Sequence, residues 1–281
     1  MKKILAFLCF SFFLSTQTLY LEAQTRNDPF AELDRVFAEI DTNPTPEDLY
    51  FLGRAVAANI LASYRPYTGN PALTRYLNLI CQAILVHIPE IELFDGASVL
   101  ILDSPELNAF TSPGGHIFIT RGLIRAANTE DMLAAIIAHE LAHIKLKHGA
   151  SLIAEMRFTE DMTAMAQRAF EFSRNAPAAQ RLINLRDSVS VVVDTLMRNG
   201  YSQIQEFEAD QEALILLALS GYNPRALIQV LEILQKMPNS ENIMLNTTHP
   251  SPSERIANIE RILGGRQFRD AASNRAHRFR N

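Results

Sequence analysis

Residues 134–149, AAIIAHELAHIKLKHG, place three of the chain's seven histidines and one glutamate in an otherwise apolar run. Thr129 can cap a helix there, the two acidic residues after it suit the positively charged helix start, and Gly149 can end it. The pattern therefore predicts a helix over residues 130–148. Two interpretations are open for its polar residues: they have no special function on a half-buried helix, or they belong to a metal site. The rest of the sequence distinguishes between the two.

Within this helix, residues 139–143 read His-Glu-Leu-Ala-His, the pattern H-E-x-x-H. Two histidines four residues apart share one helix face, so both imidazoles can reach one Zn²⁺ at about 2.0–2.1 Å. Glu140 is rotated by about 100° from His139, which places it beside the metal, as a general base requires. A catalytic zinc also needs a third protein ligand and an open fourth position.

The third ligand must come from elsewhere in the chain. His148 follows His143 by five residues, about 140° round the helix, so we expect it to point away towards the helix C-terminus or solvent. Residues 201–222 read as another helix, in which Glu206 and Asp210 share a face. A carboxylate at 206 can complete the zinc shell, and Asp210 can accept the free ring N–H of a ligand histidine. The alternative is a solvated acidic face.

The remaining pattern predicts an α+β fold that is mainly α-helical. Helix signals cover residues 45–64 and 71–88, and helical patterns dominate from residue 130 onwards. Two short stretches rich in β-branched and apolar residues, 97–104 and 116–122, read as strands joined by a loop with proline and glycine. We therefore expect one small sheet among many helices.

The chain begins like a secretory signal peptide. Two lysines precede an apolar run over residues 4–14, and a more polar stretch ends near Ala23. Residues 1–23 are predicted to be removed, and an uncleaved anchor over residues 4–21 is the alternative. The exported chain would keep only Cys81 and so no internal disulfide.

Residues 24–265 are predicted to form one domain, followed by a basic, flexible tail over residues 266–281. Within the domain, residues 151–200 are compatible with ordinary core helices or with a mobile lid over a site. The net charge of −5 argues against a nucleic-acid partner, because the phosphate backbone must be met by a basic face.

Four stretches together resemble one known family, the H-E-x-x-H/E-x-x-A-D zinc metallopeptidases (gluzincins). This is the family of the CAAX prenyl endopeptidase and the heat-shock protease HtpX, with periplasmic soluble members such as the β-barrel-assembly-enhancing protease. The resemblance covers residues 45–263 and implies a zincin-like fold. The stretches are HELAH (139–143), EFEAD (206–210), LNAFTSPGGHIFITRGLI (107–124) and NTTHPSPSERI (246–256).

The resemblance also implies the components of a catalytic site. One Zn²⁺ per chain would be held by His139, His143 and Glu206, with Glu140 as the base and Asp210 behind a ligand histidine. His249 would lie close to the metal, either stabilising the oxyanion or occupying the open position in a resting state. Ser251 and Glu254 form a capping box that would fix the corner after His249.

For the substrate, the resemblance implies an extended peptide paired on an edge strand that faces the cleft. The strand expected in this role runs from 116 to 120. The residues implied in substrate binding are Asn108, Gly115, His116, Ile117 and Phe118.

Two departures from the family pattern are visible. Gln203 stands where many relatives carry an arginine, and the membrane helices and the helical repeat domain of some members have no counterpart in this sequence. Arg255 is expected to pair with an acidic residue near the site, and the sequence leaves open which one.

Two functions from different classes remain. The first is an exported zinc endopeptidase, periplasmic or outer-membrane-associated, that clears unfolded or misfolded envelope proteins. The second is a latent or non-catalytic zinc-containing chaperone or binding protein. Glu140 favours catalysis, because a structural site has no use for a carboxylate beside the metal and structural zinc favours cysteines. The oligomeric state and peripheral association with the envelope membrane are left open.

Overall fold

The computed structural model describes residues 45–88, 91–151, 200–236, 251–266 and 268. The predictions for the signal peptide, for most of residues 151–200, for His249 and for nearly all of the tail fall outside this part of the chain.

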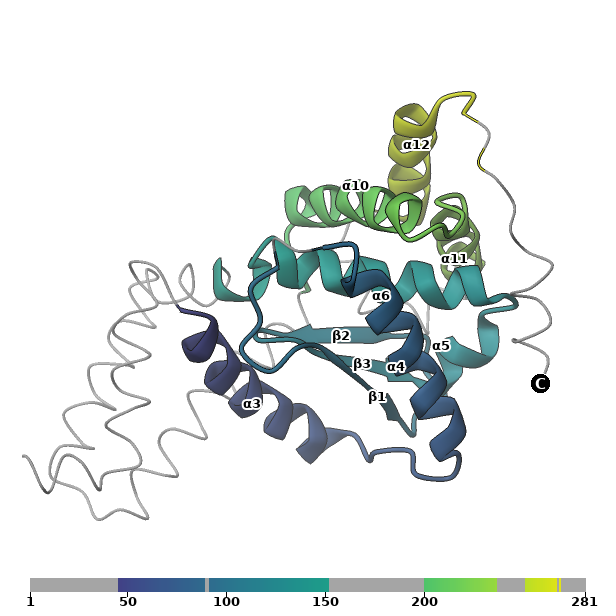
Figure 1. Cartoon of the computed structure of the whole chain (residues 1–281). Coiled ribbons are helices and arrows are strands. Elements are labelled where there is room, and N and C mark those ends of the chain that lie inside the picture. Colours follow the sequence, from purple (N-terminus) through teal and green to yellow (C-terminus); the bar gives the residue numbers. More distant parts are fainter. Residues whose placement is uncertain (1–44, 89–90, 152–199, 237–250, 267, 269–281) are drawn as a thin grey trace, which may run out of the picture. The chain divides into compact units, whose positions relative to one another are not determined.

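The described residues form an α+β fold that is mainly helical (Figure 1), which confirms the predicted fold class. No helix in the described ranges is both long and apolar enough to cross a membrane. The helices are α3 (Pro46–Ser63), α4 (Pro71–Leu85), α5 (Arg121–Ala126), α6 (Glu130–Lys145), α10 (Gln203–Leu219), α11 (Ala226–Gln235) and α12 (Pro252–Leu263), and the strands are β1 (Ser98–Leu102), β2 (Ala109–Ser112) and β3 (His116–Thr120).

The sheet has the order β1-β3-β2, with β3 parallel to β1 and antiparallel to β2. The prediction that residues 116–120 form an edge strand is therefore wrong, because β3 is paired on both sides. The two edge strands are β1 and β2, and β2, whose sequence reads as part of a loop, is the one that lines the cleft described below. The β2–β3 turn contains Gly114 and Gly115 at φ of 79° and 105°, a conformation that favours glycine. The turn folds β2 back onto β3.

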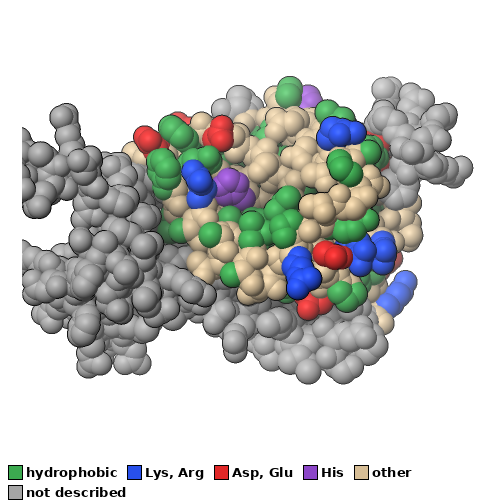
Figure 2. Space-filling view, turned by 90° about the horizontal axis from the view of Figure 1, so that it is seen from below, with side chains coloured by type: hydrophobic (Ala, Val, Ile, Leu, Met, Phe, Trp, Pro, Cys, Tyr) green, Lys and Arg blue, Asp and Glu red, His purple; other side chains and the backbone are tan. Residues whose placement is uncertain are grey.

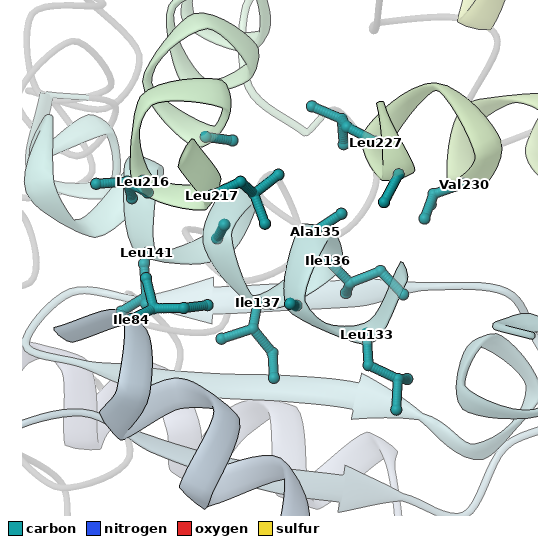
Figure 3. Close-up of a cluster of buried hydrophobic side chains, with 14 of the residues drawn as sticks. Ile84, Leu133, Ala135, Ile136, Ile137, Leu141, Leu216, Leu217, Leu227 and Val230 are labelled. Carbon is teal, nitrogen blue, oxygen red and sulfur yellow. The ribbon is translucent and has the colours of Figure 1, made fainter. Parts of the chain in front are cut away.

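Helix α6 is the central element of the core. Its N-cap is Thr129, whose hydroxyl accepts from the Met132 amide, as the sequence predicts. The helix packs against α10, α11 and α4 and against the sheet. In Figure 3, Leu133 and Ile137 extend from α6 towards the strands, and Leu217 extends from α10 towards α6. Because α6 is buried on nearly all sides, its polar residues need partners inside the protein.

Helices α10 and α12 begin with capping boxes that fix the residues near the site. Ser202 and Gln205 form the one on α10. Ser251 and Glu254 form the one on α12, as predicted.

The surface in Figure 2 mixes charge types. Basic and acidic side chains of the described residues are interspersed there, with small groups of hydrophobic side chains between them. This face carries no continuous band of basic side chains of the kind that a nucleic acid would need. The absence of a nucleic-acid partner stays a prediction.

Candidate active site

Helices α6 and α10 lie side by side (Figure 1) and bring three potential metal ligands together. His139 and His143 project from α6, and Glu206 projects from the first turn of α10. The two Nε2 atoms are 3.1 Å apart, and the Glu206 carboxylate oxygens lie 3.5 Å from the Nε2 of His139 and 3.6 Å from that of His143.

This triangle fits a zinc ion. Four ligands at about 2.0–2.1 Å in a tetrahedron are separated from one another by roughly 3.3–3.4 Å. The three observed separations lie within a few tenths of an ångström of that value. Two imidazoles and one carboxylate are also a donor set that catalytic zinc takes, with one position left for substrate or water. Among the described residues, these three form the group whose donor atoms could hold a metal ion.

Glu140 lies beside this triangle and lines the same cleft as His139 and His143. Burial raises the pKa of its carboxyl to about 7; His139 and Arg255 oppose the shift, and Glu206 adds to it. A carboxyl that titrates near neutrality can both accept and return a proton, which suits a general base that later acts as an acid.

Asp210 and Arg255 form the layer behind His139. The Asp210 carboxylate is fully buried and lies 3.2 Å from the Nδ1 of His139, so it can accept that N–H and leave Nε2 free. Arg255 donates to both oxygens of Asp210, at 2.6 and 2.8 Å, and forms an ion pair with Glu206, in which Nη1 lies 2.9 Å from Oε2. The acidic partners that the sequence left open for Arg255 are therefore Asp210 and the potential ligand Glu206.

The expectation that His148 points away from the site is wrong. Its Nδ1 lies 2.8 Å from the Nδ1 of His143, and its side chain is buried. The expectation assumed that the helix continues to residue 148, whereas α6 ends at Lys145 and Lys147 adopts a φ of 56°. That left-handed residue redirects the chain, so His148 returns towards the helix that it has just left.

Tyr201 is a neighbour of the site that the sequence analysis missed. Its ring stacks on the imidazole of His143, with the centroids 4.0 Å apart and the planes inclined by 18°. Tyr201 precedes the N-cap of α10, in a position where an aromatic residue follows no periodic pattern. Only the packing of α10 against α6 places it on His143.

A cleft of about 130 Å³ opens beside the three donors. One wall is β2 with the preceding Asn108, and apolar residues of α11 and Ile136 form another. Of the five residues predicted to bind substrate, Asn108 lines this cleft and the other four do not. Gly115 lies in the β2–β3 turn, Ile117 and Phe118 are buried in β3, and His116 packs against the ring of Tyr50.

His249 falls outside the described residues. Its placement near the metal, as an oxyanion stabiliser or as an occupant of the open position, stays a prediction.

Comparisons with known proteins find one matching family and several relatives. The sequence profile described as "Peptidase family M48" matches residues 81–263. The chain is 25% identical over 194 residues to the Beta-barrel assembly-enhancing protease of Escherichia coli (strain K12), a match that covers 68% of this chain and 39% of that protein. It is 29% identical over 182 residues to the Mitochondrial metalloendopeptidase OMA1 of Schizosaccharomyces pombe, covering 63% of this chain and 50% of that protein.

The matched part of this chain thus corresponds to half or less of each of these two relatives. Among solved structures, S. mikatae Ste24p matches with a TM-score of 0.42 and 16% identity, over 90% of this chain and 66% of that one.

Proposed function

Because this chain belongs to peptidase family M48, we propose that it is a zinc-dependent endopeptidase that acts on unfolded or misfolded proteins of the cell envelope. One observation carries the proposal: Glu140 lies beside a triangle of three donors that matches the ligand spacing of zinc. The curated relatives named as proteases or metalloendopeptidases support the same chemistry.

Each residue of the site has a task in peptide hydrolysis. Zn²⁺ held by the three donors would act as a Lewis acid on the scissile carbonyl and on the attacking water. Glu140, which lines the cleft beside the three donors, takes a proton from that water and returns it to the departing amine. Asp210 keeps the His139 ring in the orientation and tautomer that a ligand needs.

The substrate backbone is proposed to pair with β2. One edge of this strand is occupied by β3, and residues 107–111 line the cleft. Among the described residues, no further strand pairs with β2. An extended peptide that adds to a free strand edge gains main-chain hydrogen bonds that depend little on its sequence. Such binding suits unfolded proteins, whose sequences differ widely.

Another wall of the cleft adds a preference for apolar side chains. It is formed by residues of α11 together with Ile136 of α6. The α11 residues are Leu227, Val230, Leu231 and Leu234. A large apolar substrate side chain next to the cleaved bond would be removed from water there, which favours binding.

The test is digestion of casein by the full chain, with wild type and Glu140→Gln compared and the zinc content of both measured. We expect about one zinc per chain in each protein and cleavage by the wild type alone. Glu260→Gln, which changes an exposed glutamate on α12, is the matched control and should cut like the wild type.

The other outcomes separate the alternatives. If both proteins hold zinc and neither cuts, the chain is a latent protease or a zinc-containing binding protein, and casein cleavage by a His249→Ala variant would then distinguish the two. If the wild type holds no zinc, the proposed metal site is wrong. Export, to the periplasm or the outer membrane, is a separate proposal based on residues 1–23 and is checked by fractionating cells that express the chain.

A further inference from the structure

The two histidines of the proposed zinc site are supported in different ways. Behind His139 lies a carboxylate, that of Asp210. Behind His143 lies another histidine: the Nδ1 atoms of His143 and His148 are 2.8 Å apart. A hydrogen bond between two Nδ1 atoms needs a proton on one ring and a lone pair on the other, so the two tautomers depend on each other.

The position of Glu208 favours one of these two arrangements. Its carboxylate lies 3.3 Å from the Nε2 of His148, and an ionised carboxylate can only accept. A neutral His148 that donates from Nε2 presents a lone pair at Nδ1. His143 must then donate from its own Nδ1, which leaves the Nε2 of His143 unprotonated and facing His139 and Glu206.

We propose that His148 is a positioning residue for the zinc ligand His143, with Glu208 as the outer acceptor that sets the tautomers of both rings. This inference rests on the zinc site proposed above. It assigns a task to a histidine outside the H-E-x-x-H pattern, and it requires no contact between His148 and the metal.

The surroundings hold His148 in this position. The left-handed Lys147 turns the chain back at the end of α6, directly before His148, and Gly149 follows His148. The ring of Tyr201 lies against both histidines, with centroid distances of 4.0 Å to His143 and 5.9 Å to His148. His143 and His148 are 2% and 4% exposed, so an N–H of His143 that lost its acceptor would be buried with little access to water.

Helix α10 supplies both supports along one short stretch. Glu206 and Asp210 share the face towards His139, whereas Glu208 lies on another side and reaches His148 beyond the end of α6. The segment EFEAD therefore provides one potential ligand and one carboxylate behind each ligand histidine. The second glutamate of that segment otherwise has no task in the site.

The experiment measures the zinc dissociation constant of the full chain by competition with a chromogenic chelator. His148→Leu should weaken zinc binding by about 10- to 100-fold, the usual effect of removing a group that supports a ligand. His148→Asn should recover most of the affinity, because its Oδ1 can accept from His143 where Nδ1 did. His87→Leu, at an exposed histidine on another face of the fold, is the matched control and should bind like the wild type.

Glu208→Ala should weaken binding less than His148→Leu does. Glu208 is 56% exposed, so water can replace it as the acceptor for His148. We expect the loss of zinc affinity to be largest in His148→Leu, smaller in Glu208→Ala and smallest in His148→Asn. This order identifies hydrogen bonding rather than packing as the cause, because asparagine differs from histidine in shape yet keeps the acceptor.

If His148→Leu binds zinc as tightly as the wild type, the inference is overturned while the zinc site stands. If the wild type binds no zinc, the site and the inference fall together. If His148→Leu does not fold, as judged by circular dichroism, nitrogen NMR of ¹⁵N-histidine-labelled, zinc-loaded wild type decides. A His148 ring protonated at Nε2 and a His143 ring protonated at Nδ1 support the proposal, and a proton on the Nδ1 of His148 overturns it.

Discussion

Arg255 is the cation that compensates the buried carboxylates behind the proposed zinc site. It is 8% exposed, donates two short hydrogen bonds to Asp210 and forms an ion pair with Glu206. Arg255→Met keeps much of the side-chain volume and removes the charge. Two carboxylates that are 0% and 3% exposed then lose their strongest partner.

Breaking a buried ion pair by removing one partner costs about 3–5 kcal/mol of folding free energy, because the other charge stays buried. For a domain of 150–250 residues, each kcal/mol lowers the melting temperature by about 2–4 °C. We therefore expect metal-free Arg255→Met to melt roughly 6–20 °C below the wild type at pH 7, as followed by circular dichroism. Arg261→Met, at an exposed arginine on the same helix, should change the melting temperature little.

The pH dependence gives a second check. Burial raises the pKa of Asp210, but Arg255 and His139 outweigh that effect and hold it below its usual range. Since the folded pKa is below the unfolded one, the stabilisation is present above about pH 4 and is lost as the pH falls through the folded value. The deficit of Arg255→Met should thus be full at pH 7 and shrink below about pH 4. Equal melting of Arg255→Met and Arg261→Met at pH 7 would refute the charge-compensation argument.

Two further predictions concern the same cleft. In the metal-free protein, burial and Arg255 lower the pKa of His139, but Asp210 and Glu206 outweigh them and raise it to about 9. The stabilisation by protonated His139 is present below about pH 6.5 and is lost as the pH rises through 9. The melting temperature of the wild type should therefore fall between about pH 7 and 9, and that of His139→Gln should change less over the same range. Leu231→Asp, in the apolar wall, should lower kcat/KM by about 10-fold or more for peptides with a large apolar side chain beside the cleaved bond, and a smaller loss for peptides with alanine there is the internal control. An equal loss for both peptides would contradict the proposed role of that wall.

Local sequence signals were sufficient for the parts of the site that lie on single helices. The cap at Thr129 and the capping box of Ser251 and Glu254 are read from residues three apart, and the structure contains them as predicted. The four-residue spacing of His139 and His143 needs only helical periodicity. The residues alone made Glu206 a candidate third ligand, with a solvated acidic face as the alternative, and the family resemblance favoured the ligand, because no property of α10 alone indicates what it packs against.

The features that sequence reasoning missed depend on contacts between distant residues or on a single backbone angle. Strand β2 is four residues long and lies next to a Pro-Gly-Gly turn, so its sequence reads as loop, and only pairing with β3 makes it a strand. The family resemblance placed the substrate edge on residues 116–120, and with β2 read as a loop nothing in the sequence showed that both edges of β3 are occupied. The position of His148 follows from the left-handed conformation of Lys147, which is uncommon for a residue with a side chain.

Charge balance explains why so polar a cluster can lie inside a helical core. Among the described residues, the cluster contains the carboxylates of Glu140, Glu206 and Asp210 and the guanidinium of Arg255, so neutral histidines leave it with a formal charge of −2. Without a metal, the neighbouring carboxylates raise the pKa of His139, and burial raises the pKa of Glu140, so both groups favour binding a proton there. A divalent cation supplies the same two charges, and ligand histidines must be neutral to bind it. The buried cluster is thus matched in charge, as well as in spacing, to an ion such as Zn²⁺.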